Sequence, residues 1–272
     1  MMIKITQKCS MGCKHCMNDA TPEGRHMSLE KLKDVMDFIK KINLKGPIII
    51  SGGEPTEHPD FEKFCYYIME YTLKNDLDVT YIVTTNGFWI VDHPEETKKI
   101  LALGDELRKI EFQVSADVRY YPKRLPVHKR ILREKGIILC DDCVGNNIYP
   151  QGRAVKNHIE QGSSIKMTRC ANCHLIATQL KNNGNLKLST IVHNLFKSNK
   201  FCTPHIRPDG SIAIGESDLC PVVSNIYKSD EEIGKDIFEC TCNECQKYLK
   251  PIELQDLAFK FIPNNNLLSK LL

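Results

Sequence analysis

Short apolar runs recur along the first 155 residues and alternate with longer amphipathic segments. The runs are rich in β-branched residues and lie at residues 2–7, 47–51, 79–86 and 109–116, with weaker ones at 136–141 and 147–152. Runs of this length and composition predict β-strands. We therefore expect six strands in this part of the chain.

Three of the intervening segments carry apolar residues at helical spacing. Residues 28–42 place one apolar face on a helix, and this face consists of Leu29, Leu32, Val35, Met36, Ile39 and Ile42. Ser28 is a suitable N-cap, because its hydroxyl can accept a hydrogen bond from a free backbone N–H. The same spacing predicts helices over residues 60–74 and over a segment that begins at Pro94 and closes at Gly104.

Strands that alternate with helices indicate parallel βα units. Six such units suit a partial (β/α)6 TIM-like barrel better than a complete eight-fold barrel. The expected fold class is therefore α/β, with the partial barrel over residues 1–160.

A different pattern occupies residues 161–272, where polar stretches alternate with cysteines. The Pro-Asp-Gly sequence within residues 207–214 predicts the turn of a β-hairpin. Residues 251–262 have the pattern of a last helix. We expect a small cysteine-rich C-terminal extension that contains the hairpin and ends in this helix.

Composition and charge exclude several classes of protein. The chain has 272 residues, of which 42% are hydrophobic, and this is enough for a sizeable core. Its formal net charge of +3 gives no sign of a nucleic-acid-binding surface. The N-terminus lacks the apolar run of a signal peptide, and no apolar stretch approaches the roughly 20 residues that a membrane span needs. We expect a cytoplasmic protein with neither nucleic acid nor membrane as a partner.

Thirteen cysteines in a chain without an export signal need an explanation. Disulfides persist mainly in oxidising compartments, so a cytoplasmic chain this rich in cysteine more often binds metal. Cys65 is the exception, because it lies in the apolar pattern of a predicted helix and is expected to be buried there.

Cys9, Cys13 and Cys16 lie close together, directly after the first predicted strand. In a parallel barrel the loop after a strand lies at the active face. Three thiolates can hold three irons of a cubane and leave the fourth iron open to a small molecule, whereas a cluster used only for electron transfer usually takes four cysteines. The alternative is a zinc site completed by His15 or by a distant residue.

The segment CSMGCKHC matches a CxxxCxxC signature, and the chain here resembles the radical S-adenosylmethionine (SAM) enzymes, although His15 stands where the family more often has an aromatic residue. The segment SGGEP, at residues 51–55, resembles the GGEP element of the same family. Glycines let a backbone approach its ligand closely, and a glutamate can pair with an ammonium group. The resemblance implies that the amino group of SAM is bound by an edge formed of Gly52, Gly53, Glu54 and Pro55.

Two further strand ends carry segments that resemble the family. Residues 114–118 are similar to the SxD segment whose serine and aspartate meet the SAM ribose or carboxylate, and this assigns Ser115 and Asp117 to the SAM site. Asn86, in the segment TTNGF, either lines the same pocket or belongs to an ordinary Asn-Gly turn. The candidates for an arginine that holds the SAM carboxylate are Arg119, Arg124 and Arg130.

The resemblance covers about residues 2–155, including the segment QGRA at 151–154, and it implies a particular chemistry. The cofactors are a [4Fe–4S] cluster and SAM. One electron from the reduced cluster cleaves SAM, and the resulting 5′-deoxyadenosyl radical abstracts hydrogen from a substrate. An electron donor such as a flavodoxin or a ferredoxin is an expected partner.

A second cysteine pattern resembles the SPASM and twitch extensions of radical SAM enzymes. Twelve residues separate Cys202 from Gly215 and four separate Gly215 from Cys220, which fits the CX(9–15)GX(4)C pattern that opens these extensions. In the twitch version two later cysteines complete one auxiliary [4Fe–4S] cluster, and Cys242 and Cys245 have the right spacing. The remaining candidates for an auxiliary cluster or for zinc are Cys170, Cys173 and Cys240.

Cys140 and Cys143 flank the end of a predicted barrel strand, where barrel enzymes place catalytic groups. A thiol there can donate a hydrogen atom to a substrate radical, as in radical epimerases. The alternative is a buried pair of cysteines without a chemical role.

The expected function is that of a maturase, a radical SAM oxidoreductase that crosslinks, epimerises or oxidises a residue of a ribosomal peptide or a protein side chain. A separate peptide-recognition protein is then a further expected partner. The alternative is a small-molecule dehydrogenase that acts on a sugar or aminocyclitol alcohol. A non-catalytic iron–sulfur or zinc-binding sensor is a third class, but a sensor needs no GGEP edge.

Overall fold

The computed structural model describes residues 1–107, 110–115, 138–140, 151–158, 184, 186–197 and 203–240. At residues 103–107, 138–140 and 196–197 it describes the backbone alone. The helix expected over residues 251–262 lies outside the described residues.

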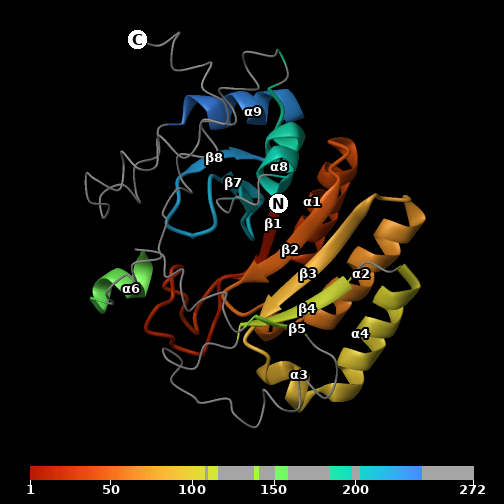
Figure 1. Cartoon of the computed structure of the whole chain (residues 1–272), viewed down its shortest axis with the longest axis vertical. Helices are drawn as coiled ribbons and strands as arrows, with labels where there is room; N and C mark the ends of the chain where they lie inside the picture. The colour runs from red at the N-terminus through yellow and green to blue at the C-terminus, as the bar shows by residue number, and fades with distance from the viewer. Residues whose placement is uncertain are drawn as a thin grey trace.

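One sheet of eight strands runs through the described part of the chain, in the order β5-β4-β3-β2-β1-β6-β7-β8 (Figure 1). Strands β1 to β5 are parallel, and those that neighbour each other in the sheet are consecutive in the chain. Their bounds are Met2–Thr6 (β1), Gly46–Gly52 (β2), Val79–Thr85 (β3), Ile110–Ser115 (β4) and Ile138–Cys140 (β5). The alternation of apolar runs and amphipathic segments therefore predicts this parallel sheet correctly.

The C-terminal strands extend the same sheet beyond β1. Strand β6 (His205–Ile206) pairs in parallel with β1, and β7 (Ser211–Ala213) and β8 (Val222–Asn225) follow in antiparallel register. The β6–β7 turn confirms the predicted hairpin. The fold is thus α/β, with a partial, barrel-like parallel sheet and antiparallel strands at its C-terminal edge.

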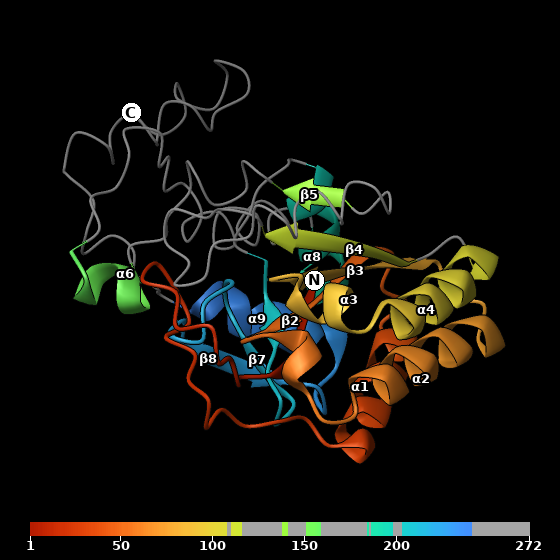
Figure 2. The same cartoon turned by 90° about the horizontal axis from the view of Figure 1, so that it is seen from below.

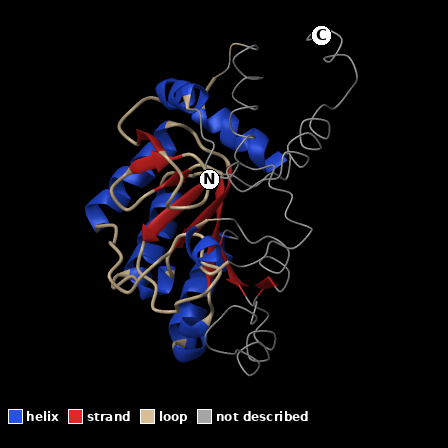
Figure 3. Ribbon diagram, turned by 90° about the vertical axis from the view of Figure 1, so that its left-hand side faces the viewer, coloured by secondary structure: helices blue, strands red, loops and turns tan. Residues whose placement is uncertain are grey.

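Three long helices cover one face of the parallel strands, as the view from below shows (Figure 2). They are α1 (Leu29–Lys41), α2 (Phe61–Lys74) and α4 (Pro94–Leu107). The other helical segments are η1 (Pro55–Glu57), α3 (Phe88–Asp92), α6 (Gly152–Lys156), α8 (Leu188–Lys197) and α9 (Asp230–Glu239). Helix α9 packs against α8 and β8. Figure 3 shows most of the described helices on one side of the strands.

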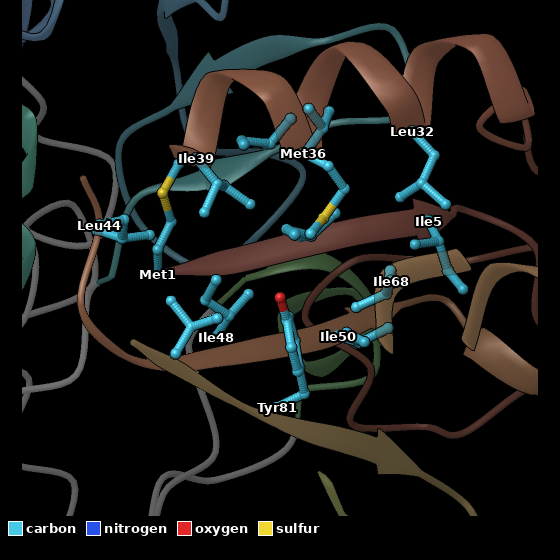
Figure 4. Packing of buried hydrophobic residues seen from close by; sticks show 14 of the residues in the cluster. Met1, Ile5, Leu32, Met36, Ile39, Leu44, Ile48, Ile50, Ile68 and Tyr81 are labelled. Atoms are coloured by element: carbon cyan, nitrogen blue, oxygen red, sulfur yellow. The ribbon is translucent and has the colours of Figure 1, made fainter. Parts of the chain in front are cut away.

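Helix α1 illustrates why these segments fold as they do. The Lys31 N–H donates to the Ser28 hydroxyl at 3.1 Å, so Ser28 is the N-cap that the sequence predicts. The buried side chains that α1 directs at the sheet include Leu32, Met36 and Ile39, which lie over β1, with Leu32 next to Ile5 at one end and Ile39 near Met1 at the other (Figure 4). A helix of this length is marginal alone, so the burial of this face supplies most of its stability.

Two expectations from the sequence are wrong in detail. Helix α4 does not close at Gly104 but continues to Leu107, because glycine weakens a helix without preventing helical backbone. Residues 147–150 of the sixth expected strand lie outside the described residues, and Gly152, at the end of that strand, instead begins α6.

Cys65 is buried in α2 as expected. Within the described ranges, the helices are too short or too polar to cross a membrane.

Candidate cluster and SAM site

The segment that carries Cys9, Cys13 and Cys16 is a loop between β1 and α1. The loop is closed near its start, where the Cys9 N–H donates to the Thr21 carbonyl oxygen at 2.9 Å. The three thiols are half-buried. Burial is the main cause that raises the pKa of Cys9 and of Cys13 to about 12, and neighbouring thiols of the same trio add to the rise. The thiols therefore lie near enough to one another to interact electrostatically.

Three interacting thiols on one loop fit the ligand set of an iron–sulfur cluster. Such clusters are bound by thiolates, each on a different iron, so these thiols have to lose their protons when a cluster is bound. Among the described residues, no three His, Cys, Asp or Glu side chains converge as the ligands of a single metal ion do. The alternative zinc site completed by His15 stays a prediction.

Gly52 and Gly53 bring the end of β2 against the chain that leads into the cysteine loop. The Gly53 N–H donates to the Thr6 carbonyl oxygen at 2.8 Å, and the Glu54 N–H donates to the Lys8 carbonyl oxygen at 2.7 Å. A Cβ atom on Gly52 would lie 2.0 Å from the Thr6 oxygen, and one on Gly53 would lie 2.1 Å from the Lys8 oxygen. A side chain does not fit at either position, so the two glycines fix where the cysteine loop begins.

We expect Gly53→Ala to lower the free energy of unfolding by about 3 kcal/mol, at the upper end of overpacking effects, because the new methyl group meets rigid backbone. The matched control is Gly46→Ala at the start of β2, where φ is +88° but nothing lies within 4 Å of a Cβ atom. That control should cost about 1 kcal/mol from its left-handed backbone alone. Urea denaturation of the two variants compares them, and equal losses would contradict a specific role for the close approach at Gly53.

The Glu54 carboxylate ties the end of β2 to the end of β3. Its Oε1 accepts from the Thr85 hydroxyl at 2.5 Å and from the Thr56 hydroxyl at 2.7 Å, and its Oε2 accepts from the Asn86 N–H at 2.7 Å. Burial raises the pKa of Glu54, although these hydrogen bonds oppose the rise. Pro55 comes next, as the first residue of η1. The role of Glu54 as a partner of the SAM ammonium group stays a prediction.

Asn86 takes part in the turn after β3. Its Oδ1 accepts from the Phe88 N–H at 3.0 Å. Gly87, between them, has a φ of 83°, which is the left-handed conformation that favours glycine. This geometry agrees with the turn interpretation of Asn86, and its place in a SAM pocket stays a prediction.

Ser115 is the last residue of β4 and lies opposite Cys140, the last residue of β5, in the parallel register. The expected SAM-site serine and one expected hydrogen-donor cysteine therefore belong to neighbouring strand ends, at the edge where barrel enzymes place catalytic groups. The other residues expected at this edge lie outside the described residues, and they are Asp117, Arg119, Arg124, Arg130 and Cys143.

Helix α6 lies beside the cysteine loop (Figures 1 and 2). The Arg153 N–H donates to the Cys16 carbonyl oxygen at 2.9 Å, and the Asn157 side-chain amide donates to the Lys14 carbonyl oxygen at 2.8 Å. Gly152, with a φ of +56°, is so close that a Cβ atom would lie 2.6 Å from the Cys16 oxygen. The QGRA segment, which the sequence marks only by resemblance, thus helps to fix the loop.

A buried polar cluster, formed by Lys4, Asn18, His205 and Asp218, joins the cysteine loop to the C-terminal strands. Lys4 is 0% exposed, and its Nζ donates to Asn18 Oδ1 at 2.9 Å and to Asp218 Oδ1 at 3.1 Å. The Asp218 N–H donates to the same Asn18 oxygen at 3.0 Å, and His205 Nε2 lies 3.6 Å from the Asp218 carboxylate. The sequence analysis assigns these residues no role. The feature of the sequence that could have indicated the cluster is Lys4, a charged residue inside an apolar strand.

Cys220, an expected auxiliary-cluster ligand, is buried next to this polar cluster. The Arg207 guanidinium donates to the carbonyl oxygens of Asp218 at 2.5 Å and of Cys220 at 2.8 Å. The Ser217 hydroxyl donates to the Met17 carbonyl oxygen at 2.9 Å. The segment that ends at Cys220 is therefore attached directly to the loop of the first three cysteines.

Among the other expected ligands of the auxiliary cluster, the structure describes Cys240 alone. Cys240 is half-buried at the C-terminal end of α9 and packs against the hydrophobic core. The ligands that lie outside the described residues are Cys170, Cys173, Cys202, Cys242 and Cys245. The auxiliary cluster therefore stays a prediction.

Comparison with known proteins agrees with the geometry of the loop. Residues 3–137 match the model of the Radical SAM superfamily. Mycofactocin maturase MftC of Mycobacterium tuberculosis is 26% identical over 115 residues, which are 42% of this chain and 26% of that protein. AdoMet-dependent heme synthase of Methanosarcina barkeri is 29% identical over 104 residues, which are 37% of this chain and 27% of that protein. The chain thus spans about a quarter of the length of the curated relatives it matches.

Among solved structures, BtrN in complex with AdoMet and 2-DOIA has a similar fold, with a TM-score of 0.51 and 15% identity over 88% of this chain and 82% of that chain. At this identity the likeness supports the fold alone. The family model covers the three cysteines and the glycine edge formed by Gly52 and Gly53, so this part of the chain, residues 3–137, belongs to the Radical SAM superfamily. Membership implies a [4Fe–4S] cluster and SAM as cofactors, and Cys9, Cys13 and Cys16 are the residues that fit the cluster.

Proposed function

We propose that the protein is an enzyme that cleaves SAM reductively and abstracts hydrogen from a substrate. The observation that carries this proposal is the trio of interacting thiols held on one loop, directly against the glycine edge of β2. When bound, a three-cysteine cluster supplies one open iron position for SAM and the electron that breaks its carbon–sulfur bond.

The residues of the chain then have distinct tasks. Cys9, Cys13 and Cys16 give up their thiol protons and bind the cluster. The backbone at Gly52 and Gly53 offers a close approach for the amino group of SAM, and the buried hydrogen bonds of Glu54 hold the ends of β2 and β3 together. The remaining SAM contacts are assigned to the next strand ends, at Asn86, Ser115 and Asp117.

We assign the substrate to a ribosomal peptide or a protein side chain, which the enzyme crosslinks, epimerises or oxidises. The similarity to MftC, which is named a maturase, supports this assignment. The partners would be a flavodoxin or ferredoxin as electron donor and a separate peptide-recognition protein. In an epimerisation, Cys140 or Cys143 would donate the returning hydrogen atom.

We also assign an auxiliary [4Fe–4S] cluster to the C-terminal extension. Of the proposed ligands, Cys220 lies among the described residues, where Arg207 donates to its carbonyl oxygen and its side chain is buried. The other ligands would be Cys202, Cys242 and Cys245. Such a cluster can accept the electron left on a substrate radical or anchor the substrate itself.

A second candidate function is that of a small-molecule dehydrogenase acting on a sugar or aminocyclitol alcohol. The observation in its favour is the fold likeness to BtrN, which was solved with AdoMet and 2-DOIA and is matched over 82% of its chain. A non-catalytic sensor would also bind iron or zinc, but it would not consume SAM.

The test is anaerobic reconstitution with iron and sulfide, reduction with dithionite and chromatography of the products. We expect 5′-deoxyadenosine to form from SAM. An intact cluster that gives none of this product would exclude the proposed chemistry and leave the sensor class. Mass spectrometry of 5′-deoxyadenosine then separates the two substrate classes, since deuterium would arrive either from a labelled peptide or from a labelled aminocyclitol.

A further inference from the structure

The Arg153 guanidinium is the feature of the cysteine loop that the proposed function leaves unused. Its Nε and one terminal nitrogen are buried and have no hydrogen-bond acceptor among the described residues. The carboxylate of Asp19 is close, but its Oδ1 lies 3.8 Å from Arg153 Nε, beyond hydrogen-bond distance. Asp19 is already bound by the Lys156 ammonium group. Buried donors on a charged group are costly without an acceptor, so these N–H groups require an acceptor that the described residues do not supply.

The position of Arg153 indicates that this acceptor lies beside the cysteine loop. Its backbone N–H is bound to the Cys16 carbonyl oxygen at 2.9 Å, and Gly152 before it is in van der Waals contact with the same segment. The two unsatisfied N–H donors therefore belong to a residue whose backbone is hydrogen-bonded to the loop of the three cysteines.

We infer that Arg153 donates N–H bonds to sulfur of the cluster held by Cys9, Cys13 and Cys16, and that it makes this cluster easier to reduce. Sulfur atoms of a cluster carry negative charge and accept hydrogen bonds, and such bonds are among the factors that set reduction potential. Arg153 would then act on the reduction potential of the cluster and not on the substrate. The inference rests on the proposed function, because it requires a cluster in this loop.

The experiment is a redox titration of the reconstituted protein without SAM, followed by electron paramagnetic resonance. The signal of the loop cluster is identified in parallel samples by its change when SAM is added. We expect Arg153→Met to shift the reduction equilibrium at least tenfold toward the oxidised cluster, which is about 59 mV for a one-electron couple. Arg153→Lys, which keeps the charge but loses the planar fork of donors, should lie between the wild type and Arg153→Met.

The matched control is Lys156→Met, in the same helix. It also removes a positive charge and a partner of Asp19, but the Lys156 side chain is 67% exposed. Solvent screens such a charge, so the control should leave the midpoint close to that of the wild type. Equal midpoints in Arg153→Met, Arg153→Lys and Lys156→Met would overturn the inference. If Arg153→Met binds no iron, Arg153→Lys alone decides, by the same comparison with the control.

Two other outcomes are distinguishable. An Arg153→Met protein with an unchanged midpoint but at least tenfold weaker binding of SAM would show that the guanidinium serves the nucleotide, and this would also overturn the inference. A wild-type protein that holds no cluster in the loop, or that does not cleave SAM, would instead contradict the proposed function. This result would be known before any variant is compared.

Discussion

A chain in which Cys9, Cys13 and Cys16 are all replaced by alanine is expected to keep its fold and to lose the cleavage of SAM completely. The three side chains are half-buried on a loop and take no part in the hydrophobic core, so their removal leaves the sheet and helices intact. The iron content should fall from about eight to about four atoms per chain, because one of two [4Fe–4S] clusters loses its ligands. Iron analysis, circular dichroism and chromatography of 5′-deoxyadenosine measure the three parts of this result.

The control is Cys65→Ala, which removes a cysteine from the core instead of the loop. Cys65 is 1% exposed in α2, and its truncation should cost about 1 kcal/mol while iron and activity stay at the wild-type level. A triple variant that still holds about eight irons and forms 5′-deoxyadenosine would refute the ligand assignment. A triple variant that holds zinc and no iron would refute the auxiliary cluster.

Lys4→Met is expected to lower the free energy of unfolding by about 3–5 kcal/mol, which is the usual cost of removing one partner of a buried ion pair. The side chains of Lys4 and Asp218 are 0% and 11% exposed, so the Asp218 carboxylate would stay buried without its cation. The same change removes one of the contacts between the Cys220 segment and the cysteine loop, so we also expect weaker retention of the auxiliary-cluster iron. Urea denaturation of the protein as isolated measures the stability.

Two further variants make this prediction specific. Lys45→Met removes one partner of an exposed pair with Asp78, 58% and 80% exposed, and should cost no more than about 0.5 kcal/mol. The double variant Lys4→Met with Asp218→Asn removes the uncompensated charge and should be more stable than Lys4→Met alone. If Lys4→Met and Lys45→Met had equal effects, the buried pair would not be the contact that joins the loop to the C-terminal strands.

Periodicity along the sequence predicts the elements of the parallel sheet well, because each one is specified locally. Ser28 and the apolar face behind it define α1, and the Pro-Asp-Gly turn defines the hairpin. Glycine is a weaker signal, since Gly104 lies inside a helix whereas Gly87 lies in a turn. Whether a glycine ends an element depends on the tertiary contacts of the neighbouring residues, and the sequence does not contain that information locally.

The pairing of β6 with β1 could not be predicted in the same way. Strand β6 has two residues, too few for a periodic pattern, and its partner lies about 200 residues earlier in the chain. The burial of Lys4 has the same origin, because the negative charge that pairs with this lysine belongs to Asp218, 214 residues away. Contacts of this length leave no local mark on composition or spacing.

For the site, motif spacing locates the cysteine loop and the glycine edge, which adjoin each other through the bonds of Gly53 and Glu54 to Thr6 and Lys8. The motif does not indicate that Glu54 uses its hydrogen-bonding capacity on Thr85, Thr56 and Asn86. That arrangement results from the register of β2 and β3, which only the folded chain defines.

The central place of β1 in the sheet has a consequence for biosynthesis. Strand β1 is flanked by β2 on one side and by β6, about 200 residues further along the chain, on the other. Its second edge therefore stays open until some 200 residues have been translated, and open strand edges are where nascent chains associate wrongly. A fragment that stops before β6 would carry all three loop cysteines next to an unpaired edge of β1, so we expect it to associate wrongly more readily than a chain that includes β6.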